Sequence, residues 1–198
     1  MKDWFFSRKQ KSSEKNRDLE IRRTLGKWEV LVSGTTQTGP FTASMWQDAL
    51  KKTPERTVQK ILLLGLGGAA SVHSLHERFP EVNVTAIEYD SAMVEVAKEI
   101  GIYRPAPFPR VILGDVREVV PSLSEKFDLI ILDVFEGSKL SPAFTDDSFL
   151  KALQARLNEG GVLMVNFSGH REAIKNIADR FPKGIIWTFR ANTLGAFW

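Results

Sequence analysis

ILLLGLGGAA at residues 61–70, followed by VTAIEYD at residues 84–90, decides the fold of this chain. An apolar run breaks at Gly65 into a glycine turn, a helical segment follows, and a second apolar run ends on the acidic Glu88. This order predicts a β-turn-α-β unit, in which glycine lets the backbone approach a ligand closely and a carboxylate accepts hydrogen bonds from a ribose. The stretch therefore predicts a site for a nucleoside-containing cofactor, without saying which one.

The glycine turn matches the dinucleotide fingerprint G-x-G-x-x-G/A through Gly65, Gly67 and Ala70, and Glu88 follows Gly65 by 23 residues. Such a match is compatible with NAD, with FAD and with S-adenosylmethionine. It also fits a tight turn between a strand and a helix that binds no ligand. Only residues elsewhere in the chain can distinguish these alternatives.

Strands and helices are expected to alternate from Lys60 to the last residue. Apolar runs predict strands at 60–66, 83–88, 110–114, 127–133, 161–167, 184–190 and 193–198. Helix-period patterns predict helices at 70–79, 91–100, 116–120, 146–157 and 170–180. The alternation predicts an α/β, Rossmann-like doubly wound sheet with the ligand crevice at the carboxyl ends of its strands.

Composition limits the function classes. The chain has 198 residues, of which 43% are hydrophobic and 26% charged, as in ordinary globular domains. It has no cysteine and three histidines, so we expect no disulfide, no metal site and a reducing, cytoplasmic location. No apolar run reaches the roughly 20 residues that cross a bilayer, so no transmembrane segment is expected.

Charge divides the chain into three expected segments. Residues 1–27 hold nine Lys and Arg against four Asp and Glu, and the remainder holds 18 against 20. The first segment is expected to be a basic, poorly ordered terminus, although its charge and aromatic residues could touch lipid or nucleic acid. Residues 28–58 are expected to be a short strand and helix lead-in, and residues 59–198 the cofactor-binding domain. This near-neutral body predicts no nucleic-acid partner.

Acidic residues follow two further expected strands. Asp115 comes directly after the third strand, where its carboxylate can accept a hydrogen bond from an adenine amino group or cap the next helix. The run FDLIILDVFE at 127–136 delivers Asp133 and Glu136 to the same crevice. These carboxylates are candidates for orienting a nucleophile and accepting its proton.

Several blocks in this order resemble the spermidine synthase-like branch of the class I S-adenosylmethionine-dependent methyltransferase superfamily. The ribose block is IEYDSAMVEVA at 87–97, the adenine block is Gly114-Asp115, and the acidic block at 127–136 is followed by FTDDSF at 144–149. Upstream, GTTQ at 34–37 and WQD at 46–48 fall where that branch has D-G-x-x-Q and Y-H-E.

The resemblance implies a seven-stranded, mostly parallel sheet of order 3-2-1-4-5-7-6 whose last strand is antiparallel, with helices on both faces. It implies that S-adenosylmethionine, or its decarboxylated form, is held by a set of cofactor residues: Gln37, Gly65, Gly67, Glu88, Tyr89, Asp115 and Val116. Asp133 and Glu136 are implied to act on a small-molecule acceptor, possibly an amine. The branch often forms dimers through its N-terminal part, so a homodimer is possible.

Five positions depart from the aminopropyltransferases of this branch. Gly68 and Thr42 replace acids, Trp46-Gln47 replaces a Tyr-His pair, and Glu136 replaces an Asp. Because acids both bind a polyamine and help an amine with a pKa near ~10 lose its proton, these changes favour methyl transfer over polyamine synthesis. The alternatives are a divergent aminopropyltransferase, an NAD-dependent oxidoreductase and a degenerate nucleoside-binding protein.

Overall fold

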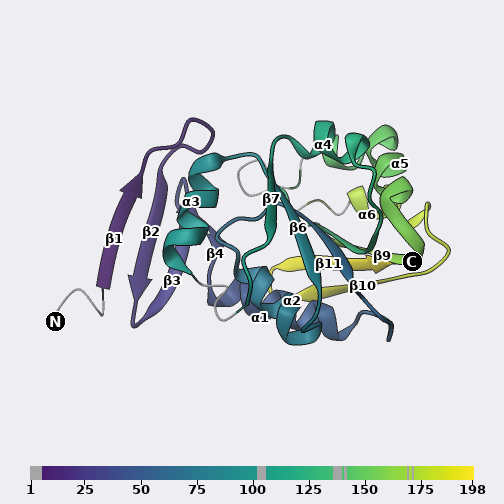
Figure 1. Cartoon of the computed structure of the whole chain (residues 1–198), viewed down its shortest axis with the longest axis horizontal. Coiled ribbons are helices and arrows are strands. Elements are labelled where there is room, and N and C mark those ends of the chain that lie inside the picture. Colours follow the sequence, from purple (N-terminus) through teal and green to yellow (C-terminus); the bar gives the residue numbers. More distant parts are fainter. Residues whose placement is uncertain (1–5, 102–105, 136–139, 141, 169, 171) are drawn as a thin grey trace.

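Two sheets build the protein, with helix α3 (Ser91–Ile100) between them (Figure 1). The computed structural model describes every residue except 1–5, 102–105, 136–139, 141, 169 and 171. The large sheet contains β5 (Lys60–Leu64), β6 (Asn83–Glu88), β7 (Arg110–Leu113), β8 (Phe127–Leu132), β9 (Leu157–Asn166), β10 (Gly184–Phe189) and β11 (Asn192–Phe197). The small sheet contains β1 (Phe6–Lys11), β2 (Leu19–Thr24), β3 (Lys27–Val32) and β4 (Thr35–Thr38).

The large sheet has the predicted topology. Its strands lie in the order β10-β11-β9-β8-β5-β6-β7. β5 pairs in parallel with β6 and β8, whereas β11 runs antiparallel to both β9 and β10. Numbered from β5, this is the order 3-2-1-4-5-7-6, so the predicted α/β methyltransferase-type sheet is confirmed. The strand order reverses between β5 and β8, where open α/β sheets bind their ligands.

Helices cover both faces of the large sheet because its central strands are apolar on both sides. Ile61 and Leu63 of β5 pack with α1 (Pro40–Lys51) and α2 (Ala70–Arg78). Leu62 and Leu64 point to the opposite face and pack with three other helices, α4 (Val116–Ser122), α5 (Asp147–Arg156) and α6 (Glu172–Ala178). A 3-10 turn, η2 (Pro142–Phe144), precedes α5.

The small sheet differs from the expectation of a poorly ordered terminus over residues 1–27. Its four strands form an antiparallel meander in the order β1-β2-β3-β4. Leu19 and Ile21 of β2 are buried against Met93 and Val96 of α3, and Val30 of β3 joins the same cluster. The high charge hid this pattern, because β1 has no buried apolar residue and β2 has only two, Leu19 and Ile21, which alternate with Glu20 and Arg22.

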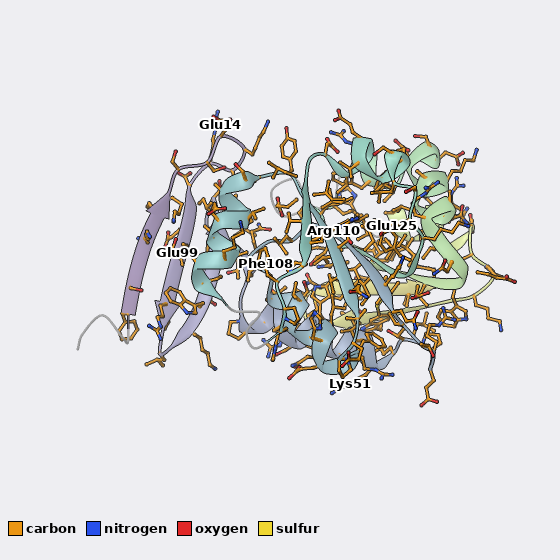
Figure 2. The ribbon with its side chains drawn as sticks, in the orientation of Figure 1. Glu14, Lys51, Glu99, Phe108, Arg110 and Glu125 are labelled. Carbon is orange, nitrogen blue, oxygen red and sulfur yellow. The ribbon has the colours of Figure 1, made fainter. Side chains whose placement is uncertain are left out.

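Ion pairs join the edge strand β1 to the same helix. Lys9 Nζ lies 2.6 Å from Glu99 Oε1, and Lys11 Nζ lies 2.5 Å from Glu99 Oε2. Figure 2 shows Glu99 on α3 beside the small sheet. The partner of these lysines is thus remote in sequence, and no local pattern in residues 1–27 indicates it.

The lead-in expected over residues 28–58 is more extensive in the structure. Ser33 and Gly34, both at positive φ, form a tight turn between β3 and β4, and α1 then runs from Pro40 to Lys51. Helix α3 is capped by Asp90, whose side chain accepts from the backbone N–H of Ala92. Within the described part of the chain, no helix is long and apolar enough to cross a membrane.

Candidate active site

The glycine turn after β5 packs directly on the end of β8. Gly65 has a φ of 88°, and a Cβ at this position would lie 2.4 Å from the carbonyl oxygen of Asp133. Only glycine fits there, because other residues avoid this φ and the contact is with backbone. The turn also approaches the small sheet, since the N–H of Gly68 donates to Thr38 Oγ1 at 2.7 Å.

Glu88 ends β6 and braces this turn. Its Oε2 accepts from the N–H groups of Leu66 at 2.9 Å and Gly67 at 3.2 Å. Its Oε1 accepts from the N–H groups of Tyr89 at 2.8 Å and Asp90 at 3.0 Å. Burial raises the pKa of the Glu88 carboxyl, although these four donors oppose the shift. Each oxygen already accepts two hydrogen bonds, so a ribose hydroxyl that donates to Glu88 would have to share or replace one of these backbone donors.

Asp115 caps helix α4, one of the two roles predicted for it. Its Oδ1 accepts from the N–H of Arg117 at 2.8 Å, and the Arg117 guanidinium lies 2.5 Å from Oδ2. Hydrogen bonds from Arg117 lower the pKa of this carboxyl and hold it ionised. The same residue lines the large cavity of the protein, so capping does not remove it from the site.

Asp133 follows β8 and accepts two side-chain hydrogen bonds. Trp46 Nε1 of α1 donates to Oδ2 at 2.9 Å, and Asn166 Nδ2 at the end of β9 donates to Oδ1 at 3.0 Å. Burial raises the pKa of Asp133 to about 6, and the two donors limit the rise. The carboxylate is therefore ionised but weakly basic at neutral pH, which suits a proton acceptor.

These residues meet in one cavity of about 540 Å³. Its walls contain the predicted cofactor residues together with Asp133: Gln37, Gly65, Gly67, Glu88, Tyr89, Asp115, Val116 and Asp133. Glu136 lies outside the described residues. The small sheet contributes Gln37 and its neighbours Thr36 and Thr38, so the cavity is shared by both sheets rather than confined to residues 59–198. This volume is in the range of pockets that hold small molecules and cofactors.

Sequence reasoning missed part of the wall. Asn16, Phe41, Met45, Asn166, Ser168 and Asn192 also line the cavity. Asn166 had a usable signal, because it is a polar residue directly after the apolar run of β9, as Glu88 is after β6. Asn16 and Asn192 had none, since only the folding of distant segments brings them to this place. Trp46 is buried in the core, and its indole N–H also donates to Asp133.

Comparisons with known proteins agree with this geometry. Residues 85–177 match a family described as S-adenosyl-L-methionine-dependent methyltransferases. A polyamine aminopropyltransferase of Vibrio vulnificus is 30% identical over 111 residues, which cover 54% of this chain and 37% of that protein. An eEF1A lysine and N-terminal methyltransferase of Mus musculus is 29% identical over 131 residues, 60% of this chain and 19% of that protein. The predicted family resemblance is confirmed.

A solved structure extends the likeness in fold. A probable spermidine synthase from Corynebacterium glutamicum has a TM-score of 0.79 at 18% identity, covering 96% of this chain and 79% of that one. The predicted cofactor class agrees with the description of the matched family. The aminopropyltransferase and methyltransferase relatives are both named as enzymes, in agreement with the prediction of an enzyme. The matched segments span only 19–37% of the length of these two relatives and of a probable polyamine aminopropyl transferase of Bifidobacterium longum.

Proposed function

We propose that this protein binds S-adenosylmethionine in the cavity between its two sheets and transfers the methyl group to a small acceptor, with an amine as the candidate. The glycine turn supports the binding step, since Gly65 leaves no room for a side chain against Asp133 and keeps backbone at the cavity wall. Glu88 would accept from the ribose hydroxyls, and Asp115 would face the adenine. Gln37, Gly67, Tyr89 and Val116 complete the proposed cofactor wall.

The distribution of carboxylates carries the choice of methyl transfer. Three described acidic residues line the cavity. Glu88 takes four backbone N–H groups and Asp115 is paired with Arg117, which leaves Asp133 to face a cationic acceptor or cofactor tail. A polyamine, or the decarboxylated cofactor with its extra net positive charge, calls for more than one such acid.

Position 68 strengthens this argument. The aminopropyltransferases that the chain resembles have an acid there, but a Cβ on Gly68 would lie 2.7 Å from Thr38 Cγ2 and 3.0 Å from Val30 Cγ2. The small sheet thus occupies the space that an acidic side chain would need. Thr42, the other neutral replacement, lies in the cavity wall.

The proposed mechanism uses the chain's own groups for alignment and for one proton. When bound, S-adenosylmethionine supplies a methyl group on a positively charged sulfur. The cavity holds the acceptor in line with that carbon and keeps water out, so most of the rate gain comes from positioning. Asp133 would accept the proton that the acceptor loses as it takes the methyl group from the sulfonium, whose sulfur would keep the electron pair of the broken bond.

Calorimetric titration tests the binding half of the proposal. The protein is titrated with S-adenosylmethionine, its decarboxylated form, S-adenosylhomocysteine, methylthioadenosine and NAD. We expect S-adenosylmethionine to bind at least about tenfold more tightly than its decarboxylated form, a difference of about 1.4 kcal/mol. The reverse preference would favour aminopropyl transfer, the second candidate, which the Vibrio relative supports by its name and 30% identity. Binding of NAD alone would favour an oxidoreductase.

Turnover tests the chemical half. Release of S-adenosylhomocysteine is measured with a panel of small amines and of peptides with free amino groups, because one relative is named for a protein acceptor. On the acceptor found, Asp133→Asn should abolish turnover and leave the Kd for S-adenosylhomocysteine within twofold. Full activity in that variant would remove Asp133 from the mechanism. Tight binding without turnover on any acceptor would favour a degenerate binding protein. A cytoplasmic location and a homodimer stay predictions.

A further inference from the structure

The β1–β2 loop, residues 12–18, lies beside the end of β6. Ser13 Oγ donates to Asp90 Oδ2 at 2.6 Å, and Asn16 Nδ2 donates to the same oxygen at 2.5 Å. Within the loop, Ser13 Oγ accepts from the N–H groups of Lys15 and Asn16. Asp90 is 2% exposed, and its other oxygen caps α3. The loop is therefore fixed to a buried carboxylate two residues after Glu88.

Lys15 makes a second connection at the same place. Its ammonium donates to the Tyr89 hydroxyl at 3.1 Å and lies 4.5 Å from the centre of the Tyr89 ring. Tyr89 lines the cavity and is 53% exposed, so the lysine rests on a side chain that forms part of the cavity rim. A flexible, solvated loop would not need two separate anchors on consecutive residues of the ribose block.

Asn16 is the loop residue that reaches the cavity wall. Its amide nitrogen is used by Asp90, and among the described residues no hydrogen bond to its carboxamide oxygen is recorded. An oxygen in this position can accept a hydrogen bond from a hydroxyl or amino group of a ligand. The anchors on Tyr89 and Asp90 place it beside the end of β6, where the adenosine would lie under the proposed function.

We propose that Asn16 is a further cofactor-binding residue, and that the β1–β2 loop is a wall of the adenosine subsite. The proposal rests on the proposed function, since it takes the ligand to be an adenosyl compound. Ser13 and Lys15 are positioning residues that hold Asn16 at the end of β6. The N-terminal hairpin thereby becomes a part of the cofactor site.

Calorimetry on full-length variants tests this assignment with two ligands that share adenosine. S-adenosylhomocysteine carries an amino-acid tail that methylthioadenosine lacks. Asn16→Ala should weaken both ligands by the same factor, about five- to tenfold, the loss of one hydrogen bond to a buried partner. Glu14→Ala is the matched control, because Glu14 is exposed and points outward from the tip of the loop (Figure 2). It should change either Kd by less than twofold.

Each other outcome has a separate meaning. If the wild-type protein binds neither ligand, the proposed function and this proposal fail together. If the wild-type protein binds both and Asn16→Ala binds them equally well, the proposal alone fails. Weakening of S-adenosylhomocysteine only would place Asn16 at the tail and contradict the adenosine assignment. Because Asn16→Ala also loses its hydrogen bond to the buried Asp90, a modest drop in the melting temperature of the ligand-free variant is expected, and a drop large enough to unfold the hairpin at the titration temperature would assign Asn16 a structural role instead.

Discussion

The Asp133 carboxyl is buried and accepts hydrogen bonds from two side chains, and these two features together set its pKa. Burial raises its pKa to about 6, while the hydrogen bonds from Asn166 and Trp46 favour the ionised form. Trp46 can only donate, so it cannot replace the carboxylate as a proton acceptor. Trp46 stands where the aminopropyltransferases of this branch have a tyrosine, and its contact with Asp133 orients that carboxylate.

The raised pKa makes stability depend on pH in a defined direction. An unfolded Asp has a pKa near ~3.9, so the folded protein binds this proton more tightly. The resulting stabilisation is complete below about pH 4 and is lost as the pH rises through about 6. Between pH 7 and pH 4.5 we expect wild type to gain about 2 kcal/mol relative to Asp133→Asn, measured by urea unfolding.

Asp128 is a control of opposite sign. Burial opposes the shift, but hydrogen bonds from the backbone of Gln59, from Asn158 and from the backbone of Lys60 lower the pKa of Asp128. Its contribution is present above the unfolded pKa and is lost as the pH falls, so Asp128→Asn should lose stability at pH 7 more than at low pH. The same pH slope in both variants would refute the assigned pKa of Asp133.

Gly65 and Gly26 separate backbone strain from steric contact. Both have positive φ, 88° and 77°, but a Cβ at Gly26 meets nothing within 4 Å, whereas at Gly65 it meets backbone at 2.4 Å. Gly26→Ala should cost about 1 kcal/mol through its φ alone. Gly65→Ala should cost about 3 kcal/mol or more and abolish cofactor binding, because the turn must separate from β8. Equal costs in urea unfolding would show that the turn has room to move.

At the scale of elements, the sequence predicts the helices and strands whose hydrophobic pattern lies within the element itself. The large sheet follows from apolar runs at regular spacing, and its order follows from the resemblance. β1 and β2 escaped prediction because their apolar residues are few and because Lys9 and Lys11 of β1 pair with Glu99, far along the chain. Asn192 of the cavity wall escaped for the same reason, since pairing of β11 with β9 alone brings it near Asn166.

The hairpin β1–β2 should be held by its apolar contact with α3 more than by its ion pairs. Ile21 is 2% exposed in the cluster with Met93 and Val96, whereas Lys9 and Glu99 are largely exposed. Ile21→Ala should cost about 2–5 kcal/mol. Glu99→Gln should leave the free energy of unfolding within error of wild type at physiological salt, because water and ions screen such pairs. A larger loss in Glu99→Gln than in Ile21→Ala would reverse this ranking.

At the scale of the molecule, the site lies where the two sheets meet. Thr38 of β4 binds the glycine turn after β5, and the β1–β2 loop binds the residues after β6. The cavity takes its walls from both sheets, so a ligand that fills it touches both. Without ligand, the small sheet is joined to the rest by its packing on α3, by the contacts of β3 and β4 with α1 and by these few polar contacts, and we expect it to open separately.

This arrangement predicts that the cofactor product links the stability of the two sheets. S-adenosylhomocysteine at about a hundred times its Kd should raise the opening free energy of amides in both β3 and β5 by about 2.7 kcal/mol, since either opening destroys the site. Native-state hydrogen exchange on peptides covering residues 27–32 and 60–64 measures both. If protection rises in β5 alone, the small sheet opens without releasing the ligand, and the site belongs to the large sheet only. Equal rises would show that both sheets are needed to hold the ligand.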